Sequence, residues 1–173
     1  FDATDTTMQT TTATSDASGD VTVTLYSTTP GTATITASSC LDNCAVTQAD
    51  SQTVDFEPGA LASFDVAPIA NTTAGVQFSA EVTALDQYGN IITGYSGAPS
   101  VTLVSGTASA GPTGPSFSSG KSTLTGTIEV AGNYQINVTD AAPEPDITAL
   151  SNTFTITAAS PASMTLVAGD GQT

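Results

Sequence analysis

Residues 75–84, GVQFSAEVTA, alternate apolar and polar side chains without a break. On an extended chain this pattern places Phe78 and Val82 on one face and Ser79 on the other. A period of two is typical of an antiparallel strand that packs one face on a core and leaves the other in water. The stretch therefore predicts a half-buried strand in a β-sheet.

The same alternation recurs along the chain. It is present in residues 21–26 (VTVTLY), 123–130 (TLTGTIEV), 133–138 (NYQINV) and 154–157 (FTIT). Turn sequences rich in glycine, proline, aspartate and asparagine separate these stretches, and residues 86–90 (DQYGN) predict a hairpin turn that uses glycine for a positive φ. No segment keeps an apolar period of 3.6 residues, so we expect an all-β fold with little or no helix.

One sequence pattern recurs about 100 residues later in the chain. Residues 27–38 (STTPGTATITAS) return as residues 128–139 (IEVAGNYQINVT), 101 positions later. Residues 51–56 match residues 151–156 at a separation of 100, so one insertion or deletion between residues 39 and 50 reconciles the two separations. A recurring module of this kind is the mark of a tandem array.

The repeat predicts where the modules begin and end. Residues 1–58 are expected to form the C-terminal part of one module, residues 59–158 a complete module, and residues 159–173 the first strand of a following module. A lone strand cannot bury its apolar face or satisfy its backbone. We therefore expect the incomplete ends to be completed by flanking modules or by neighbouring copies of the chain.

The repeated residues carry a family resemblance. Residues 19–25 (GDVTVTL), followed by residues 27–37, resemble the end of a bacterial Ig-like module of the invasin/intimin type, and such modules also occur in archaea. Residues 74–78 (AGVQF), leading to residues 84–90 (ALDQYGN), resemble the early strands of that superfamily. The resemblance implies tandem immunoglobulin-like β-sandwich modules in an extracellular, cell-surface protein.

The charge is strongly acidic. The chain has sixteen aspartate and glutamate residues and a single basic residue, Lys121, which gives a formal net charge of −15. Binding to nucleic acid and to anionic bilayers depends on clusters of lysine and arginine, so neither is expected as a partner. No apolar run approaches the roughly 20 residues that span a bilayer, and residues 1–15 do not have the pattern of a signal peptide.

Two cysteines, Cys40 and Cys44, lie in the segment SSCLDNCA. The chain has no histidine and no third cysteine, so a zinc site would lack ligands. The preferred interpretation is a disulfide that closes a tight loop in an oxidising exterior, and the alternative is a pair of reduced thiols.

Two sequons could accept N-linked glycans. Asn71 lies in an expected loop, and Asn137 lies on the polar face of an expected strand. In a chain rich in threonine such triplets also arise by chance, so both interpretations stay open.

Carboxylates gather at Asp140, Glu144 and Asp146, where a module junction could collect the oxygen ligands that calcium prefers. The chain has no EF-hand loop, and solvated turn residues are the alternative. No other cofactor is expected.

The sequence contains few residues that could take part in catalysis. Without histidine the usual base for a serine nucleophile is missing, so we do not expect an enzyme. The favoured function is a structural segment of a surface layer, a filament or an adhesin stalk. The alternative is a carbohydrate-binding accessory module of a secreted enzyme or adhesin tip, for which Tyr88 and Tyr95 would be the aromatic platform.

Overall fold

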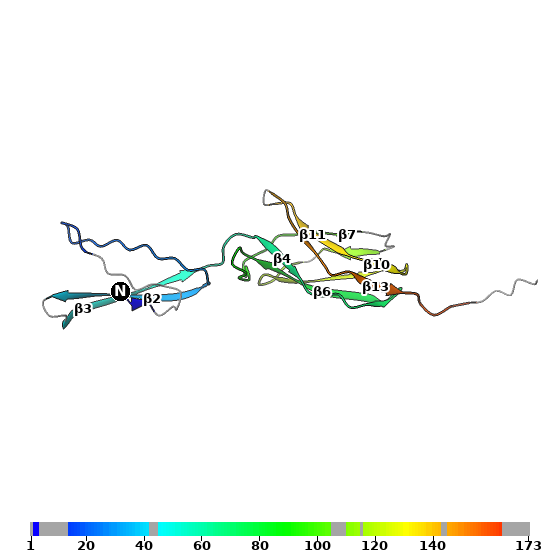
Figure 1. Ribbon diagram of the computed structural model, residues 1–173, viewed down its shortest axis with the longest axis horizontal. Coiled ribbons are helices and arrows are strands. Elements are labelled where there is room, and N and C mark those ends of the chain that lie inside the picture. Colours follow the sequence, from blue (N-terminus) through cyan, green and yellow to red (C-terminus); the bar gives the residue numbers. More distant parts are fainter. Residues whose placement is uncertain are drawn as a thin grey trace, which may run out of the picture. The chain divides into compact units, whose positions relative to one another are not determined.

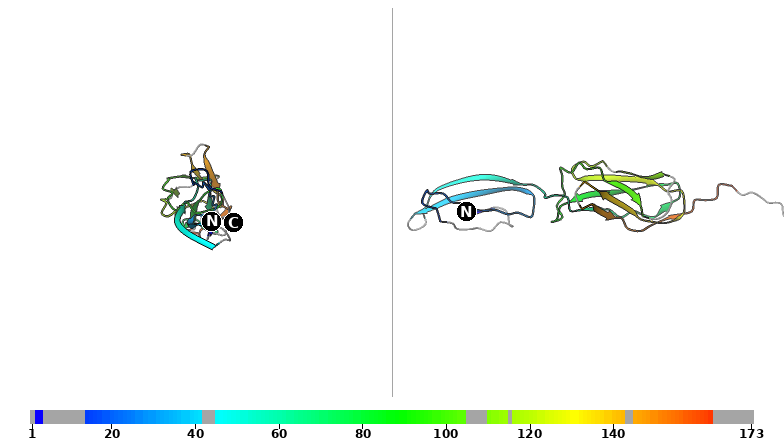
Figure 2. Two further views of the ribbon diagram at one scale, coloured as in Figure 1. Left: turned by 90° about the vertical axis from the view of Figure 1, so that its left-hand side faces the viewer. Right: turned by 90° about the horizontal axis from the view of Figure 1, so that it is seen from above.

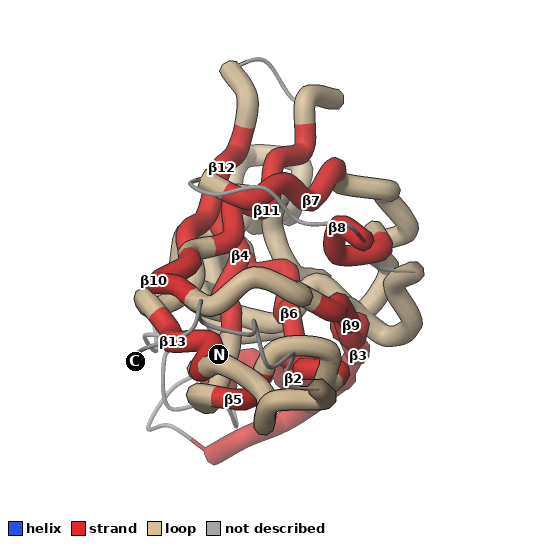
Figure 3. The backbone as a smooth tube through the Cα atoms, turned by 90° about the vertical axis from the view of Figure 1, so that its right-hand side faces the viewer, coloured by secondary structure: helices blue, strands red, loops and turns tan. Residues whose placement is uncertain are grey.

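The computed structural model describes residues 2–3, 14–41, 45–104, 110–114, 116–142 and 145–163. In these ranges the regular structure consists of β-strands and contains no helix (Figure 3). The expected all-β class is thereby confirmed, and its sheets are arranged as in an Ig-like β-sandwich. The described ranges therefore contain no helix that is long and apolar enough to cross a membrane.

The chain divides into two compact units. The first contains residues 1–62 and 85–93, and the second contains residues 63–84 and 94–173. The module boundaries expected near residues 58 and 158 remain predictions.

A long hairpin dominates the first unit (Figure 1). Its sheet has the order β1-β2-β3, with β1 at Asp2–Ala3, β2 at Gly31–Leu41 and β3 at Ala45–Phe56. The antiparallel pairing runs from Gly31 opposite Phe56 to Leu41 opposite Ala45, with a register shift between Ser39 and Cys40. One face of β2 presents Ala33 and Ile35, and the other presents threonines, as the period of two requires.

The strand predicted at residues 21–26 is not formed. The segment is extended but belongs to none of the described sheets. A strand needs a neighbour to satisfy its backbone, and no described segment of the first unit pairs with it. The alternation of residues 21–26 predicts a strand, but in the described part of the chain this segment has no partner strand.

The second unit is a β-sandwich (Figure 2). One layer has the order β4-β6-β9-β8, with β4 at Ser63–Val66, β6 at Gln77–Leu85, β9 at Lys121–Thr127 and β8 at Ala110–Thr113. The opposite side holds two short sheets. The first is β12-β11-β7 (Ile147–Leu150, Ile136–Asp140, Ser100–Leu103), and the second is β10-β13-β5 (Gly132–Tyr134, Phe154–Thr157, Thr72–Thr73).

Alternating side chains from the two layers form the core of this unit. Phe78 of β6 and Phe154 of β13 have ring centroids 5.2 Å apart, and Tyr134 of β10 lies 6.3 Å from Phe154. Leu124, Ile128, Ile136, Val138 and Phe154 are fully buried. The strands predicted at residues 75–84, 123–130, 133–138 and 154–157 are therefore present for most of their length. Val76 and Val130 were expected on the inward faces, but both lie outside the strands and are exposed, and Gln135 interrupts the third predicted strand.

The two units repeat one pairing register. Gly31 lies opposite Phe56 in the first unit, and Gly132 lies opposite Ile156 in the second. The next two pairs of each ladder correspond in the same way. The separations are 101 on one strand and 100 on the other, which are the two separations seen in the sequence.

The correspondence ends where the second ladder is interrupted. The long strand β2 corresponds to two short strands, β10 and β11, separated by Gln135. At this break Ser151 N donates to Ile136 O at 2.9 Å, and Ile136 N donates to the Ser151 hydroxyl oxygen at 3.0 Å. The serine side chain thus replaces a backbone acceptor and satisfies a buried donor.

Candidate functional site

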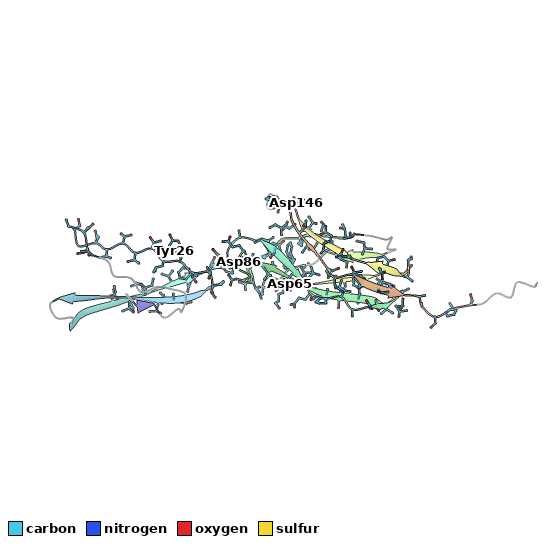
Figure 4. All side chains as sticks on the ribbon, in the orientation of Figure 1. Tyr26, Asp65, Asp86 and Asp146 are labelled. Atoms are coloured by element: carbon cyan, nitrogen blue, oxygen red, sulfur yellow. The ribbon has the colours of Figure 1, made fainter. Side chains whose placement is uncertain are left out.

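Asp86 is the most densely hydrogen-bonded side chain in the described residues. It lies at the end of β6, where Figure 4 labels it, and it is 3% exposed. Both of its carboxylate oxygens accept hydrogen bonds. Its Oδ1 accepts from the backbone N–H groups of Tyr88 and Asn90, each at 2.9 Å. Its Oδ2 accepts from Gly59 N at 2.9 Å and from Asn90 Nδ2 at 2.9 Å.

These contacts determine the acidity of Asp86. Burial raises the pKa of Asp86, but hydrogen bonds from the Asn90 side chain and from the backbone of Gly59, Asn90 and Tyr88 outweigh it and lower the pKa from 3.8 to about 2. The charged form is therefore the one that the site stabilises.

The predicted hairpin turn at residues 86–90 is confirmed. Leu85 pairs with Ile91, Gly89 has a φ of 83°, and Gly89 N donates to Asp86 O at 3.0 Å. Asn90 Nδ2 also donates to Thr28 O at 2.7 Å, within the same first unit. The turn thus holds two other segments of that unit, one at Thr28 and one at Gly59.

An aromatic cluster surrounds Tyr95 in the second unit. Its ring packs edge-on against Phe64 at 5.7 Å and against Phe117 at 4.7 Å between centroids. The Tyr95 hydroxyl donates to Asp140, which is 7% exposed and also accepts from Ala142 N at 3.0 Å. Burial, together with the hydrogen bond and the charge of Asp140, raises the pKa of Tyr95 above its ordinary value of 10.0.

The two tyrosines of the predicted ligand platform have different surroundings. Tyr95 is half-buried in the aromatic cluster, and its hydroxyl is committed to Asp140. Tyr88 is 58% exposed in the turn of the first unit. A platform at these positions remains a prediction.

The predicted calcium ligands are only partly described. Asp140 is committed to Tyr95 and Ala142, Asp146 is exposed, and Glu144 lies outside the described residues. The described part of the chain contains no group of three candidate metal ligands. Calcium at Asp140, Glu144 and Asp146 stays a prediction.

The cysteine pair also lies at the limit of what is described. Cys40 belongs to β2, but its side chain is not described, and Cys44 lies outside the described residues. The disulfide between them remains a prediction.

The two sequons are placed differently. Asn71 is exposed, and its Oδ1 accepts from Thr155 N at 2.8 Å. Asn137 is partly buried on the central strand β11, and its Nδ2 donates to Thr139 Oγ1 at 3.1 Å. Of the two, Asn71 is the more accessible to a modifying enzyme, and modification of either remains a prediction.

Sequence reasoning did not identify Asp86 or Ser151 as anchoring residues. Residues 86–90 predict a turn, but nothing in the sequence shows that Gly59 will donate to the carboxylate from 27 positions away. Ser151 matches Ser51 in the repeat, but only the structure shows that the ladder around Ser151 differs from the ladder around Ser51.

No family model matches the chain, and no curated protein matches it significantly. Several solved structures resemble it. S-layer protein SbsC domains 4 and 5 share 20% identity at a TM-score of 0.44, covering 74% of this chain and 66% of that one. The D00-D0 domain of intimin shares 17% identity at a TM-score of 0.46, covering 72% of this chain and 64% of that one.

A longer structure, SbsC domains 4–9, shares 18% identity at a TM-score of 0.44 and covers 81% of this chain. This chain spans 20% of that longer structure. With every TM-score below 0.5, these likenesses assign neither a role nor a partner to this chain.

Proposed function

We propose that the chain is a structural segment of an extracellular, cell-surface protein built from Ig-like modules in series. The assembly would be a surface layer, a filament or an adhesin stalk. Its partners would be flanking Ig-like modules or neighbouring copies of the chain.

The observation that carries this proposal is the repeated register. Gly31 opposite Phe56 and Gly132 opposite Ile156 are equivalent pairs in two units of one chain. Repeat proteins reuse one folding unit to gain length and surface. Such reuse suits a scaffold, because each added module increases the length of the scaffold.

The buried polar groups support the same role. Asp86 holds a turn, Asp140 holds Tyr95, and Ser151 bridges the break beside Ile136. Each of these side chains forms hydrogen bonds that fix a loop or a strand end. Such contacts increase rigidity, which a load-bearing segment requires.

The surface chemistry also fits an exterior scaffold. The chain is acidic, with a formal net charge of −15, and Lys121 pairs with Glu81 at 2.8 Å. A strongly acidic surface keeps neighbouring modules soluble and attracts a diffuse atmosphere of cations.

The test is to locate the chain in its native setting. Antibodies raised against the full chain should label the outside of intact cells or their isolated envelopes, and mild proteolysis of intact cells should remove the label. A label confined to the interior of permeabilised cells would overturn the proposal. A glycan array probed with the chain tests the carbohydrate-binding alternative, because specific binding lost in Tyr88→Ala would favour that function instead.

A further inference from the structure

The two sequons of the chain occupy different positions in the sheets of the second unit. Asn71 directly precedes β5, which is the end strand of the described sheet β10-β13-β5 (Figure 3). Asn137 lies within β11, which is the middle strand of the sheet β12-β11-β7. A glycosylating enzyme must reach both the asparagine and the threonine two positions later, so a sequon at the end of a sheet is the more accessible substrate.

The Asn71 side chain uses only one end of its amide to hold the fold. Asn71 is exposed, and its Oδ1 accepts a hydrogen bond from Thr155 N at 2.8 Å. Because a backbone N–H can only donate, this contact fixes which end of the amide is the oxygen. An N-linked glycan is joined to the other end, Nδ2, and leaves Oδ1 as an acceptor. The contact with Thr155 is therefore compatible with a glycan on Asn71.

The threonine of the first sequon has a fixed backbone and a weakly held hydroxyl group. Residues 72 and 73 pair with β13, and Ala74 N donates to Thr157 O at 2.8 Å. Thr73 Oγ1 lies 3.4 Å from Thr157 Oγ1, beyond the roughly 3.0 Å that a hydroxyl pair normally reaches. The Thr73 hydroxyl thus stays available to an enzyme that recognises the sequon.

The second sequon has the opposite arrangement. Asn137 Nδ2, the atom that would carry the glycan, donates to Thr139 Oγ1 at 3.1 Å, and Asn137 Oδ1 is buried without a hydrogen-bond partner in the described residues. Thr102 and Leu150 lie directly opposite Asn137 on the two flanking strands. Residues placed in this way have Cβ atoms only about 5 Å apart, so a sugar on Nδ2 would meet both neighbours.

We infer that Asn71 carries an N-linked glycan in the native protein and that Asn137 does not. This inference rests on the proposed function, since N-linked glycans are attached to exported chains. The donor is a glycan carried on a lipid phosphate or diphosphate. Asn71 Nδ2 forms a bond to the anomeric carbon of the sugar and gives up a proton to a base of the enzyme. The bond between that carbon and the phosphate oxygen breaks, and its electron pair leaves with the phosphate.

Mass spectrometry of the full chain from native cell envelopes tests both sequons in one digest. A protease that cuts after aspartate and glutamate releases residues 66–81, which contain Asn71, and residues 130–140, which contain Asn137. We expect residues 66–81 as a glycopeptide whose fragments locate the glycan on Asn71. Residues 130–140 should have the unmodified mass.

Variants expressed in the same organism separate the sequon from its surroundings. Thr73→Ala removes the sequon but keeps Asn71 and its hydrogen bond to Thr155, so it should lose the glycan completely. Thr72→Ala is the matched control, because it changes the neighbouring threonine of β5 and leaves the sequon intact. The glycan should therefore remain in Thr72→Ala, whereas an O-linked sugar on Thr72 would be lost.

Three results would overturn the inference. The first is an unmodified mass for residues 66–81 of the native chain, and the second is a glycan on these residues that persists in Thr73→Ala. The third is a glycan on Asn137. An unmodified Asn71 in a chain that antibodies still label at the cell surface would overturn this inference alone. An interior location would instead overturn the proposed function.

Discussion

Tyr95 donates its hydroxyl hydrogen to Asp140, and this contact links the aromatic cluster of the second unit to the end of β11. The only other hydrogen bond to the Asp140 carboxylate in the described residues comes from Ala142 N. A buried carboxylate that loses one of two donors is left partly unsatisfied. The Tyr95 hydroxyl should therefore contribute to the stability of the second unit.

Tyr95→Phe removes that oxygen and keeps the ring. We expect it to lower the free energy of unfolding by about 1–3 kcal/mol, measured by urea denaturation. Tyr26→Phe is the matched control, because Tyr26 is 80% exposed, and it should change stability little. Equal effects of the two variants would contradict the structural role of the hydroxyl.

The same contact predicts a response to alkali. Burial and Asp140 raise the folded-state pKa of Tyr95 above 10.0, so the folded state retains the proton that the unfolded state loses. The stability that Tyr95 contributes is thus present below pH 10 and declines as the pH rises above it. Denaturation at several alkaline pH values should show a smaller decline in Tyr95→Phe than in the parent chain.

Asp86 predicts the opposite dependence on pH. Its pKa is 3.8 when unperturbed and about 2 in the folded chain. The stability from the Asp86 carboxylate is therefore present above pH 3.8 and is lost as the pH falls through 2. Thermal melts between pH 5 and pH 2 should fall less steeply in Asp86→Asn than in the parent chain. Asp65→Asn is the control, since Asp65 is exposed on β4, and a similar change in slope there would contradict this role of Asp86.

Gly126 predicts a steric effect in the core. Gly126→Ala places a methyl group against the Phe78 ring and should destabilise the chain by about 1–3 kcal/mol, measured by urea denaturation. Combining it with Phe78→Leu should cost less than the sum of the two single changes, because the smaller side chain relieves the clash. Gly94→Ala is the control, since a Cβ there meets no atom within 4 Å. Strict additivity of the first two changes would contradict the contact.

Ser151 predicts a local effect on the interrupted ladder. Ser151→Ala removes the acceptor of the buried Ile136 N–H and should lower the free energy of unfolding by about 1–3 kcal/mol. Hydrogen exchange at the Ile136 amide should also accelerate. Ser160→Ala, at an exposed position, should leave both quantities unchanged.

Much of the second unit could be predicted from the sequence, because its alternation is strict where both layers cover it. Phe78 and Val82 are buried on β6, and Leu124 is buried on β9, as a period of two requires. The strand at residues 21–26 shows the limit of this reasoning. Alternation reports which face of a segment suits a core, but pairing depends on a neighbour that local sequence does not specify.

Anchoring contacts were harder to predict than strands. The bond between Gly59 N and Asp86 joins positions that are 27 residues apart, and that between Ile69 N and Asn152 joins positions 83 apart. Contacts between such distant positions cannot be predicted from their spacing in the sequence. The turn at residues 86–90 was predictable because its glycine and its Asp–Asn hydrogen bonds are local.

The most direct test of the proposed function is cryo-electron microscopy of native cell envelopes or filaments, at a resolution that traces strands. We expect this chain to lie within a series of β-sandwich modules of similar fold. The proposal would be contradicted if the chain were an isolated domain with no module of similar fold beside it.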